Sequence, residues 1–484
     1  MVLKLFNTLG RKKQEFKPLK DGQVSFYYCG PTVYSQQHIG NLRGAVCADS
    51  IRRSLEYLGY SVNFVSNYTD VGHLTSDEDE GEDKIEQGAK KEGLSPADIT
   101  NKYIKIYEKD TEKLNILPPT TRCRATDYIK PMEEMVATLL KKGFAYQTEL
   151  AIYFDVSKAN NYTQLSGQNL EDLKTGAGTG DVVDPQKKNQ NDFVLWFFKT
   201  GVHAKALQTW ESPWGEACLP ARQGFPGWHI ECSVMAKKHL GETLDIHMGG
   251  IEHIPIHHTN EIAQSESANG VKYVNYWLHN EHLGIDNTKM SKSLGNVVYV
   301  NNIEEKGFHP LALRFFFLQA HYRSKQNFTW KAMEAAKNGL THLDNQRADL
   351  GDEVGKISKE FKQKFIEKIS DDFNLPQALA IVSEVLKSDL SKADKLATIL
   401  DFDKVLGLNL KQKRFNLFTK TTKFITKGYD VEMTLNNKIS NLLKERDAAR
   451  KNKDWAESDR IRDEIESQGY TVKDTPDGTQ IFNP

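Results

Sequence analysis

The sequence predicts an α/β fold: a parallel-sheet domain with a connective insertion, then an α-helical bundle and a small C-terminal helix-hairpin domain. Three observations support this order. Strand and helix patterns alternate early in the chain, strand signals become rare after about residue 330, and the last segment combines a charged helix with two short strands. A chain of 484 residues has room for roughly two to four domains.

The first strand–helix–strand unit is the clearest element. Residues 24–29 are rich in aromatic residues that favour strands and end at Gly30, a turn signal. A helical pattern follows over about residues 39–58, and Gly59 stands where helices usually end. Residues 62–65 are the next predicted strand. A βαβ unit of this kind predicts the start of a parallel sheet.

The sheet domain is expected to span residues 1–330 and to be interrupted. After Pro118 the alternation gives way to helix, hairpin-like pieces and a polar loop, which predicts an insertion over about residues 118–225. The α/β pattern resumes at residues 244–247.

Two further segments complete the predicted organisation. Residues 331–410 are expected to form the helical bundle. Residues 411–484 comprise a basic linker, a charged helix over about residues 435–467, and two short strands joined at Asp477-Gly478, a hairpin signal.

Bulk composition limits the class of protein. The chain is 39% hydrophobic and 27% charged, and no apolar run reaches the roughly 18–20 residues that span a bilayer. The N-terminal segment is too short and too polar for a signal peptide, so a cytoplasmic location is expected. A monomer without a membrane partner is also expected. Five scattered cysteines without a CxxC pair argue against a disulfide framework and leave single functional thiols open.

Charge is balanced overall but uneven locally. A net charge of −1 gives no general attraction to nucleic acid. Residues 77–83 are strongly acidic and are expected to form a solvated loop. Residues 411–428 contain six cations and no acid, which would suit a phosphate backbone, although a flexible basic linker explains them equally well.

A first candidate phosphate site opens the first long helix. His38, Ile39, Gly40 and Asn41 follow the first strand directly. A helix N-terminus presents unpaired N–H groups to an anion, and Gly40 would let a nucleotide approach the backbone closely. His38 could donate a hydrogen bond to a phosphate oxygen as charge develops. Taken alone, however, the pattern favours a histidine that only caps the helix.

A second candidate phosphate site lies downstream, in the string KMSKS. Its cationic and hydroxyl side chains are Lys289, Ser291, Lys292 and Ser293. Two lysines three residues apart, among small residues, make a cationic loop that suits a transition state from which pyrophosphate leaves. An ordinary basic surface loop is the alternative, but it accounts poorly for the whole string.

A candidate metal site lies between the two motifs. On a helix, His257 and Glu261 are four residues apart and share a face. With thiolates from Cys29 and Cys232 they would give two sulfur, one nitrogen and one oxygen ligand, a set suited to Zn²⁺. Four of the 14 histidines fall within residues 247–258, which supports a metal neighbourhood. The alternative is that Cys232 is a small buried apolar residue.

The two phosphate motifs resemble the HIGH and KMSKS signatures of class I aminoacyl-tRNA synthetases. They lie about 250 residues apart, with a βαβ start before the first. The second match is complete, whereas Asn41 replaces the second histidine of the first motif. Asparagine can hydrogen-bond but carries no proton charge. The resemblance implies a Rossmann-like catalytic domain.

Within that class the chain resembles the cysteinyl-tRNA synthetases over most of its length. The resemblance rests on residues 26–40, 226–233 and 257–266 and on the C-terminal helix-hairpin. It implies ATP-dependent attachment of L-cysteine to its tRNA through a cysteinyl-adenylate. It also implies one Zn²⁺ per chain, with Cys29, Cys232, His257 and Glu261 as its ligands.

The resemblance also assigns roles to the two motifs. It gives catalysis to His38, Lys289 and Lys292, and ATP binding, with Mg²⁺, to His38, Gly40, Asn41, Lys289, Ser291, Lys292 and Ser293.

Other family positions carry weaker implications. Thr69 matches a family position near the substrate amino group. Trp228 matches a family tryptophan that packs near the substrate, although a tryptophan of the core is the alternative. His247 would orient a ligand or be a satisfied core histidine. The family pattern is altered at Glu252, which replaces Asp, and at Thr259, which replaces Glu.

Zinc would select the substrate by bond chemistry. It lowers the pKa of a coordinated thiol, whereas the hydroxyl of serine is a harder and poorer ligand. A pocket that discriminates by size reaches only roughly 10–200-fold. No editing domain is therefore expected.

The tRNA for cysteine is the expected macromolecular partner. The C-terminal segment resembles an anticodon-reading domain, with cations and one aromatic residue at Arg446, Arg450, Lys451, Lys453 and Trp455. A salt-bridged surface helix explains the same charges.

Two rival functions remain open. A cysteine ligase acting on an amino sugar would share both motifs and the zinc site but normally lacks the anticodon module. A zinc-dependent RNA-binding protein would not need the lysine loop.

Overall fold

The computed structural model describes residues 2–72, 74, 83–168, 184–214, 223–289, 295–412, 437–467, 471–475 and 478–482. The chain divides into two compact units, Met1–Gln412 and Lys413–Pro484. The acidic residues 77–82, the basic residues 413–428 and most of the lysine loop, including Ser291, Lys292 and Ser293, lie outside the described residues.

A five-stranded parallel sheet forms the centre of the first unit, in the order β12-β11-β3-β4-β5. Its strands are β3 (Gln23–Tyr28), β4 (Ser61–Tyr68), β5 (Thr121–Arg124), β11 (Leu244–Gly250) and β12 (Val274–Asn280). All four pairings are parallel. The chain builds outward from β3 in both directions, so β3 and β11 meet at the topological switch point. Ligands of such Rossmann-like sheets bind beyond the carboxyl ends of these strands.

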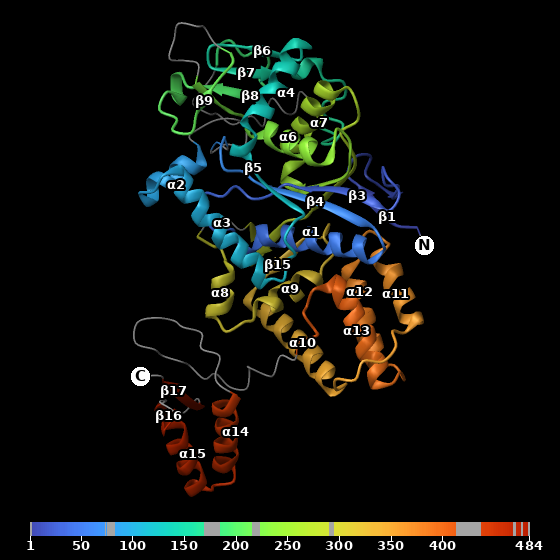
Figure 1. The fold of residues 1–484 in the computed structure, drawn as a ribbon, viewed down its shortest axis with the longest axis vertical. Coiled ribbons are helices and arrows are strands. Elements are labelled where there is room, and N and C mark those ends of the chain that lie inside the picture. The colour runs from blue at the N-terminus through green and yellow to red at the C-terminus, as the bar shows by residue number, and fades with distance from the viewer. Residues whose placement is uncertain are drawn as a thin grey trace. The chain divides into compact units, whose positions relative to one another are not determined.

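Helix α1 (Ile39–Tyr57) connects β3 to β4 and is buried over most of its length. It contacts β4 and β11 of the sheet and also α9 (Pro310–Leu318) and α13 (Lys392–Leu406). Figure 1 shows it between the sheet and the helical bundle. α1 therefore begins at the carboxyl edge of the sheet and forms part of the boundary with the bundle.

A buried ion pair fixes this boundary. Arg314 Nη2 on α9 lies 2.6 Å from Asp49 Oδ2 on α1, and both side chains are fully buried. Arg314 also donates to the backbone oxygens of Leu406, at 2.8 Å, and Leu114, at 3.0 Å. Asp49 additionally accepts a hydrogen bond from Arg53 Nε at 2.8 Å. This network links α1, α9 and the end of α13.

The insertion begins later than the expected residue 118. β5 pairs in parallel with β4 and so belongs to the central sheet. Its sequence, Thr-Arg-Cys-Arg, has only Cys123 buried, so it lacks the apolar run that identifies a central strand. After α4 (Ile129–Lys141) the chain forms an antiparallel sheet in the order β6-β7-β8-β10-β9. Its strands are β6 (Ala145–Gln147), β7 (Ala151–Phe154), β8 (Phe193–Phe198), β9 (Trp210–Glu211) and β10 (Gln223–Pro226).

Smaller elements complete the first unit. A hairpin of β1 (Lys4–Asn7) and β2 (Lys12–Glu15) precedes β3, and helices α2 (Lys84–Glu92) and α3 (Pro96–Lys113) lie between β4 and β5. β13 (Leu283–Ile285) pairs with both β14 (Thr288–Lys289) and β15 (Gln326–Phe328), and α8 (Val300–Glu305) lies between the latter two.

The segment expected to be a bundle is helical. It contains α10 (Trp330–Asp349), α11 (Lys359–Ile369), α12 (Leu375–Lys387) and α13. No described helix of the whole chain is long and apolar enough to cross a membrane.

The second unit corrects one expectation. The single charged helix predicted over about residues 435–467 is two helices, α14 (Asn437–Lys451) and α15 (Trp455–Ser467). Lys453 adopts a φ of 60°, which ends the helical path, and Asp454 Oδ1 accepts a hydrogen bond from Glu457 N at 3.1 Å and so begins α15. The predicted hairpin is present as β16 (Thr471–Thr475) and β17 (Gly478–Phe482).

Asp49→Asn should destabilise the first unit strongly. The substitution leaves the buried Arg314 guanidinium without a charged partner, which typically costs about 3–5 kcal/mol. Urea denaturation followed by tryptophan fluorescence measures the loss. Glu56→Gln on the same helix is the matched control, because its Arg52 pair at 2.8 Å lies near the surface and should contribute less than about 1 kcal/mol. Equal effects of the two substitutions would contradict this role of the buried pair.

Candidate active site

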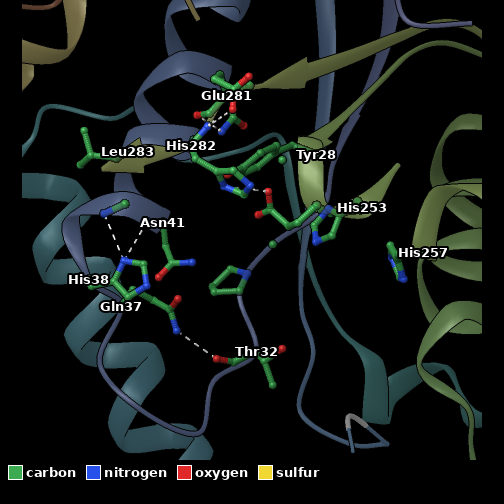
Figure 2. Close-up of a pocket in the computed structure, with 18 of the residues that line it drawn as sticks. Tyr28, Thr32, Gln37, His38, Asn41, His253, His257, Glu281, His282 and Leu283 are labelled. Carbon is green, nitrogen blue, oxygen red and sulfur yellow. Dashed lines mark hydrogen bonds and ion pairs between the residues drawn. The ribbon is translucent and has the colours of Figure 1, made fainter. Parts of the chain in front are cut away.

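A cavity of about 800 Å³ lies beyond the carboxyl ends of β3 and β11. Its wall includes Cys29, which follows β3, and Gly250, which ends β11. His38 and Asn41, at the start of α1, line a second part of the cavity wall. Thr288 of β14 lines a third part. Figure 2 shows His38, Asn41 and His257 around this space. One cavity therefore joins the predicted metal site, the first phosphate motif and the hairpin from which the lysine loop starts.

The four predicted metal ligands converge at one end of the cavity. Cys232 lies on α6 (Trp228–Leu240), and His257 and Glu261 lie in the first turns of α7 (His257–Asn269). The sulfur atoms of Cys29 and Cys232 are 3.8 Å apart. Glu261 Oε1 lies 3.1 Å from His257 Nε2 and 3.9 Å from Cys29 Sγ. All four side chains are buried, and their ligand atoms lie within 4.8 Å of one another.

These distances suit a tetrahedral ion. With Zn–S bonds of about 2.3 Å, tetrahedral geometry sets two sulfur ligands about 3.8 Å apart. Burial raises the pKa of both the Cys29 thiol and the Glu261 carboxyl, so their anionic forms are disfavoured without a cation. A bound divalent ion would reverse that preference. The chemistry of the donors and their spacing therefore both fit Zn²⁺.

A second set of donors overlaps the first, and sequence reasoning missed part of it. Cys29 Sγ also lies 3.3 Å from His247 Nε2 and 3.4 Å from His258 Nε2, and both histidines face Glu261 Oε1. His258 precedes Glu261 by three residues and so shares its helix face, a spacing that could have identified it.

The two sets of possible metal ligands differ in whether their side chains line the cavity. Cys29, Cys232 and His257 line the cavity, whereas His247 and His258 do not. His258 Nδ1 is instead 2.7 Å from His279 Nε2. Of the two sets in the described residues, the predicted one would thus present an ion to the cavity. His247 is fully buried and lies against Cys29.

His38 is the N-cap of α1. Its Nδ1 accepts hydrogen bonds from the backbone N–H groups of Gly40, at 3.1 Å, and Asn41, at 3.3 Å (Figure 2). A neutral ring that accepts at Nδ1 carries its proton on Nε2, so the capping bonds fix the tautomer. A Cβ on residue 40 would lie 2.9 Å from the His38 ring, so this arrangement requires glycine.

Trp228 and Thr69 both line the cavity. The Trp228 ring stacks on the His257 ring, with centroids 4.3 Å apart and planes 24° from parallel. Because Trp228 is only half-buried, its position at the cavity wall differs from that of a core tryptophan. Thr69 follows β4, and its Oγ1 accepts a hydrogen bond from Asn67 Nδ2 at 3.3 Å.

The lysine loop begins at the end of β14. Lys289 ends β14, where it pairs with Gly284 of β13, and the preceding Asn287 and Thr288 line the cavity. Ser291, Lys292 and Ser293 lie outside the described residues. The described hairpin therefore brings the start of the loop to the cavity wall.

Two family models match the chain. Residues 15–338 match the class I (C) tRNA synthetase catalytic domain, and residues 434–481 match the cysteinyl-tRNA ligase anticodon-binding domain. The first match covers more than half of the chain and includes the whole cavity.

Curated relatives match over the full length. A protein of Burkholderia lata named cysteine–tRNA ligase 1 is 42% identical over 483 residues, covering 100% of this chain and 97% of the relative. A cysteine–tRNA ligase of Treponema denticola is 42% identical over 500 residues, covering 98% of each.

Solved structures share the fold at low identity. The ternary complex of Agrobacterium radiobacter K84 agnB2 LeuRS with tRNA and LeuAMS gives a TM-score of 0.57 at 11% identity and covers 96% of each chain. Mycobacterium tuberculosis methionyl-tRNA synthetase with methionyl-adenylate gives 0.51 at 14% identity, covering 81% of this chain and 90% of that one.

Cys232→Ser should remove most of the bound metal. A serine hydroxyl is a harder ligand that stays protonated at neutral pH, so the site loses one of its two thiolates. Elemental analysis of the purified protein should find about one zinc per wild-type chain and far less in the variant. Cys47→Ser is the control, because Cys47 is buried on α1 outside the cluster. A variant with wild-type metal content would contradict the ligand assignment.

Proposed function

This chain belongs to the cysteine–tRNA ligase family, and from that premise we propose how its residues carry out the reaction. The enzyme attaches L-cysteine to tRNA in an ATP-dependent reaction through a cysteinyl-adenylate. The observation that best supports the residue assignments is the single cavity, which is lined by Cys29, Cys232 and His257 at one part and His38 at another. A thiol and a triphosphate could thus be held in one space.

Zinc is the proposed resident metal, held by Cys29, Cys232, His257 and Glu261. When bound, it supplies a soft Lewis acid that favours a substrate thiolate over the hydroxyl of serine. The chain's own residues would orient the remainder of the amino acid. Trp228, stacked on His257, would pack against it, and Thr69 would accept a hydrogen bond from its ammonium group.

Adenylate formation needs charge placed around the phosphates. A carboxylate oxygen of cysteine bonds to the α-phosphorus of Mg-ATP while the bond to the pyrophosphate oxygen breaks. His38 would donate its Nε2 proton in a hydrogen bond to a phosphate oxygen, and Gly40 and Asn41 would border the nucleotide. The departing pyrophosphate would be stabilised by the loop side chains of Lys289, Ser291, Lys292 and Ser293.

The other domains would serve the tRNA. We assign catalysis to residues 1–330, the helical bundle to residues 331–410, and a basic linker with the anticodon-binding module to residues 411–484. In that last segment Trp455 is 57% exposed, and the Arg450 guanidinium lies 5.7 Å from its ring centroid. An exposed ring beside a cation suits stacking on unpaired bases. An amino-sugar acceptor has no support from the relatives or from the anticodon-domain match.

Cysteine should drive ATP–pyrophosphate exchange without tRNA, and tRNA should then accept the amino acid. The preference for cysteine over serine in exchange should exceed the roughly 10–200-fold that a size-selective pocket achieves, because the metal discriminates by bond chemistry. Parallel exchange assays with the two amino acids measure the ratio. A ratio within that range would contradict selection by the metal, and transfer to an amino sugar but not to tRNA would contradict the assigned acceptor.

His38→Asn should separate the capping role of His38 from its catalytic role. Asparagine is a good N-cap, so the stability should change by less than about 1 kcal/mol. The variant lacks an imidazole N–H for the phosphate, so the rate constant for exchange should fall about 10²–10³-fold. Thermal denaturation and exchange kinetics measure the two effects.

A second capping histidine provides the control. His309 caps α9, with its Nδ1 accepting from Leu311 N at 3.1 Å, and it does not line the cavity. His309→Asn should leave exchange unchanged. Wild-type exchange in His38→Asn would mean that His38 serves only as a cap.

A further inference from the structure

The two carboxylate oxygens of Glu261 have different surroundings. Oε1 faces the metal cluster, 3.1 Å from His257 Nε2 and 3.9 Å from Cys29 Sγ. Oε2 accepts a hydrogen bond of 3.1 Å from the hydroxyl of Tyr273. Glu261 is fully buried, so neither oxygen is exposed to bulk solvent. The carboxylate thus has one oxygen directed at the cluster and one occupied by the protein.

The position of Tyr273 is fixed by its surroundings. It immediately precedes β12 and is 1% exposed. Its ring is packed edge-on by His247, at 5.8 Å, and Trp277, at 6.0 Å. Its backbone N–H donates to Glu266 Oε1 on α7 at 3.1 Å, and its backbone oxygen accepts from Leu244 N at 2.8 Å. The hydroxyl is therefore held in a defined place relative to the helix that carries Glu261.

A carboxylate can bind a metal through one oxygen or through both. A phenol retains its proton at neutral pH and so donates to Oε2, which stabilises the orientation in which only Oε1 faces the ion. Beside the other three protein ligands, binding through one oxygen would leave room for a fifth ligand from the cavity. That open position is what a substrate sulfur would need.

We propose that Tyr273 is a positioning residue that holds Glu261 as a one-oxygen metal ligand. The inference rests on the proposed function of the site. Tyr273 does not line the cavity, so its effect on the substrate would be transmitted through Glu261.

Tyr273→Phe removes only the hydroxyl and keeps the packed ring. The Zn²⁺ affinity, measured by competition with a chromophoric chelator, should fall about 10–100-fold, as for other groups that orient metal ligands. In metal-saturated enzyme the KM for cysteine should rise while the KM for ATP stays the same. A general loss of structure would instead affect both substrates.

Two further variants sharpen the test. Tyr276→Phe removes the hydroxyl of a buried tyrosine in β12, three residues after Tyr273. That hydroxyl donates to Glu15 O at 2.8 Å, so the substitution should leave Zn²⁺ affinity unchanged. In a Glu261→Gln background, Tyr273→Phe should add little further loss, because its effect acts through the carboxylate.

The outcomes distinguish this inference from the proposed function. Wild-type Zn²⁺ affinity in Tyr273→Phe, or an equal loss in the Glu261→Gln background, overturns the role of Tyr273 but leaves the metal site intact. A wild-type enzyme that binds no Zn²⁺ overturns both.

Discussion

The close approach of two buried sulfur atoms, 3.8 Å apart at the carboxyl end of the central strand pair, is the constraint on which the site depends. The backbone holds Cys29 there, because Cys29 N donates to Met248 O of β11 at 3.1 Å. The next residue is equally restricted, since a Cβ at Gly30 would lie 1.7 Å from Asn67 O. The chain is thus confined between β11 and the end of β4 before it turns towards His38. The metal cluster and the phosphate motif share one cavity because only eight residues, 30–37, separate Cys29 from His38.

Sequence reasoning identified the elements with strong local signals. The strand before Gly30 and the helix after His38 have periodicity and clear boundary residues, and both occur in the structure. β5 was not predicted as a strand of the central sheet, because its pairing depends on its neighbour β4 rather than on its own composition. The break at Lys453 was missed because a left-handed residue followed by an aspartate cap interrupts a charge pattern that is otherwise continuous.

The candidate site, like the fold, was predictable only in part from the sequence. Its four proposed metal ligands come from three distant segments, which no local pattern joins, so the ligand set depended on resemblance to a family. The spacing of His258 before Glu261 was a signal that could have been used. The contact of Tyr273 with Glu261 could not be predicted, because it joins two elements that no local pattern relates. For His38 the sequence offered capping and phosphate binding as alternatives. The geometry makes them compatible, since acceptance at Nδ1 leaves the proton on Nε2.

The ion pair between Asp49 and Arg314 has a consequence for how this protein can change over evolutionary time. Replacing both members of a buried ion pair by apolar residues of similar volume is often harmless. Replacing only one member leaves an unpaired charge in the protein interior. The two positions, 265 residues apart, should therefore be inherited together or exchanged together. Related sequences that keep only one of the two charged residues should be rare. Covariation of these two positions would then reflect the contact between α1 and α9.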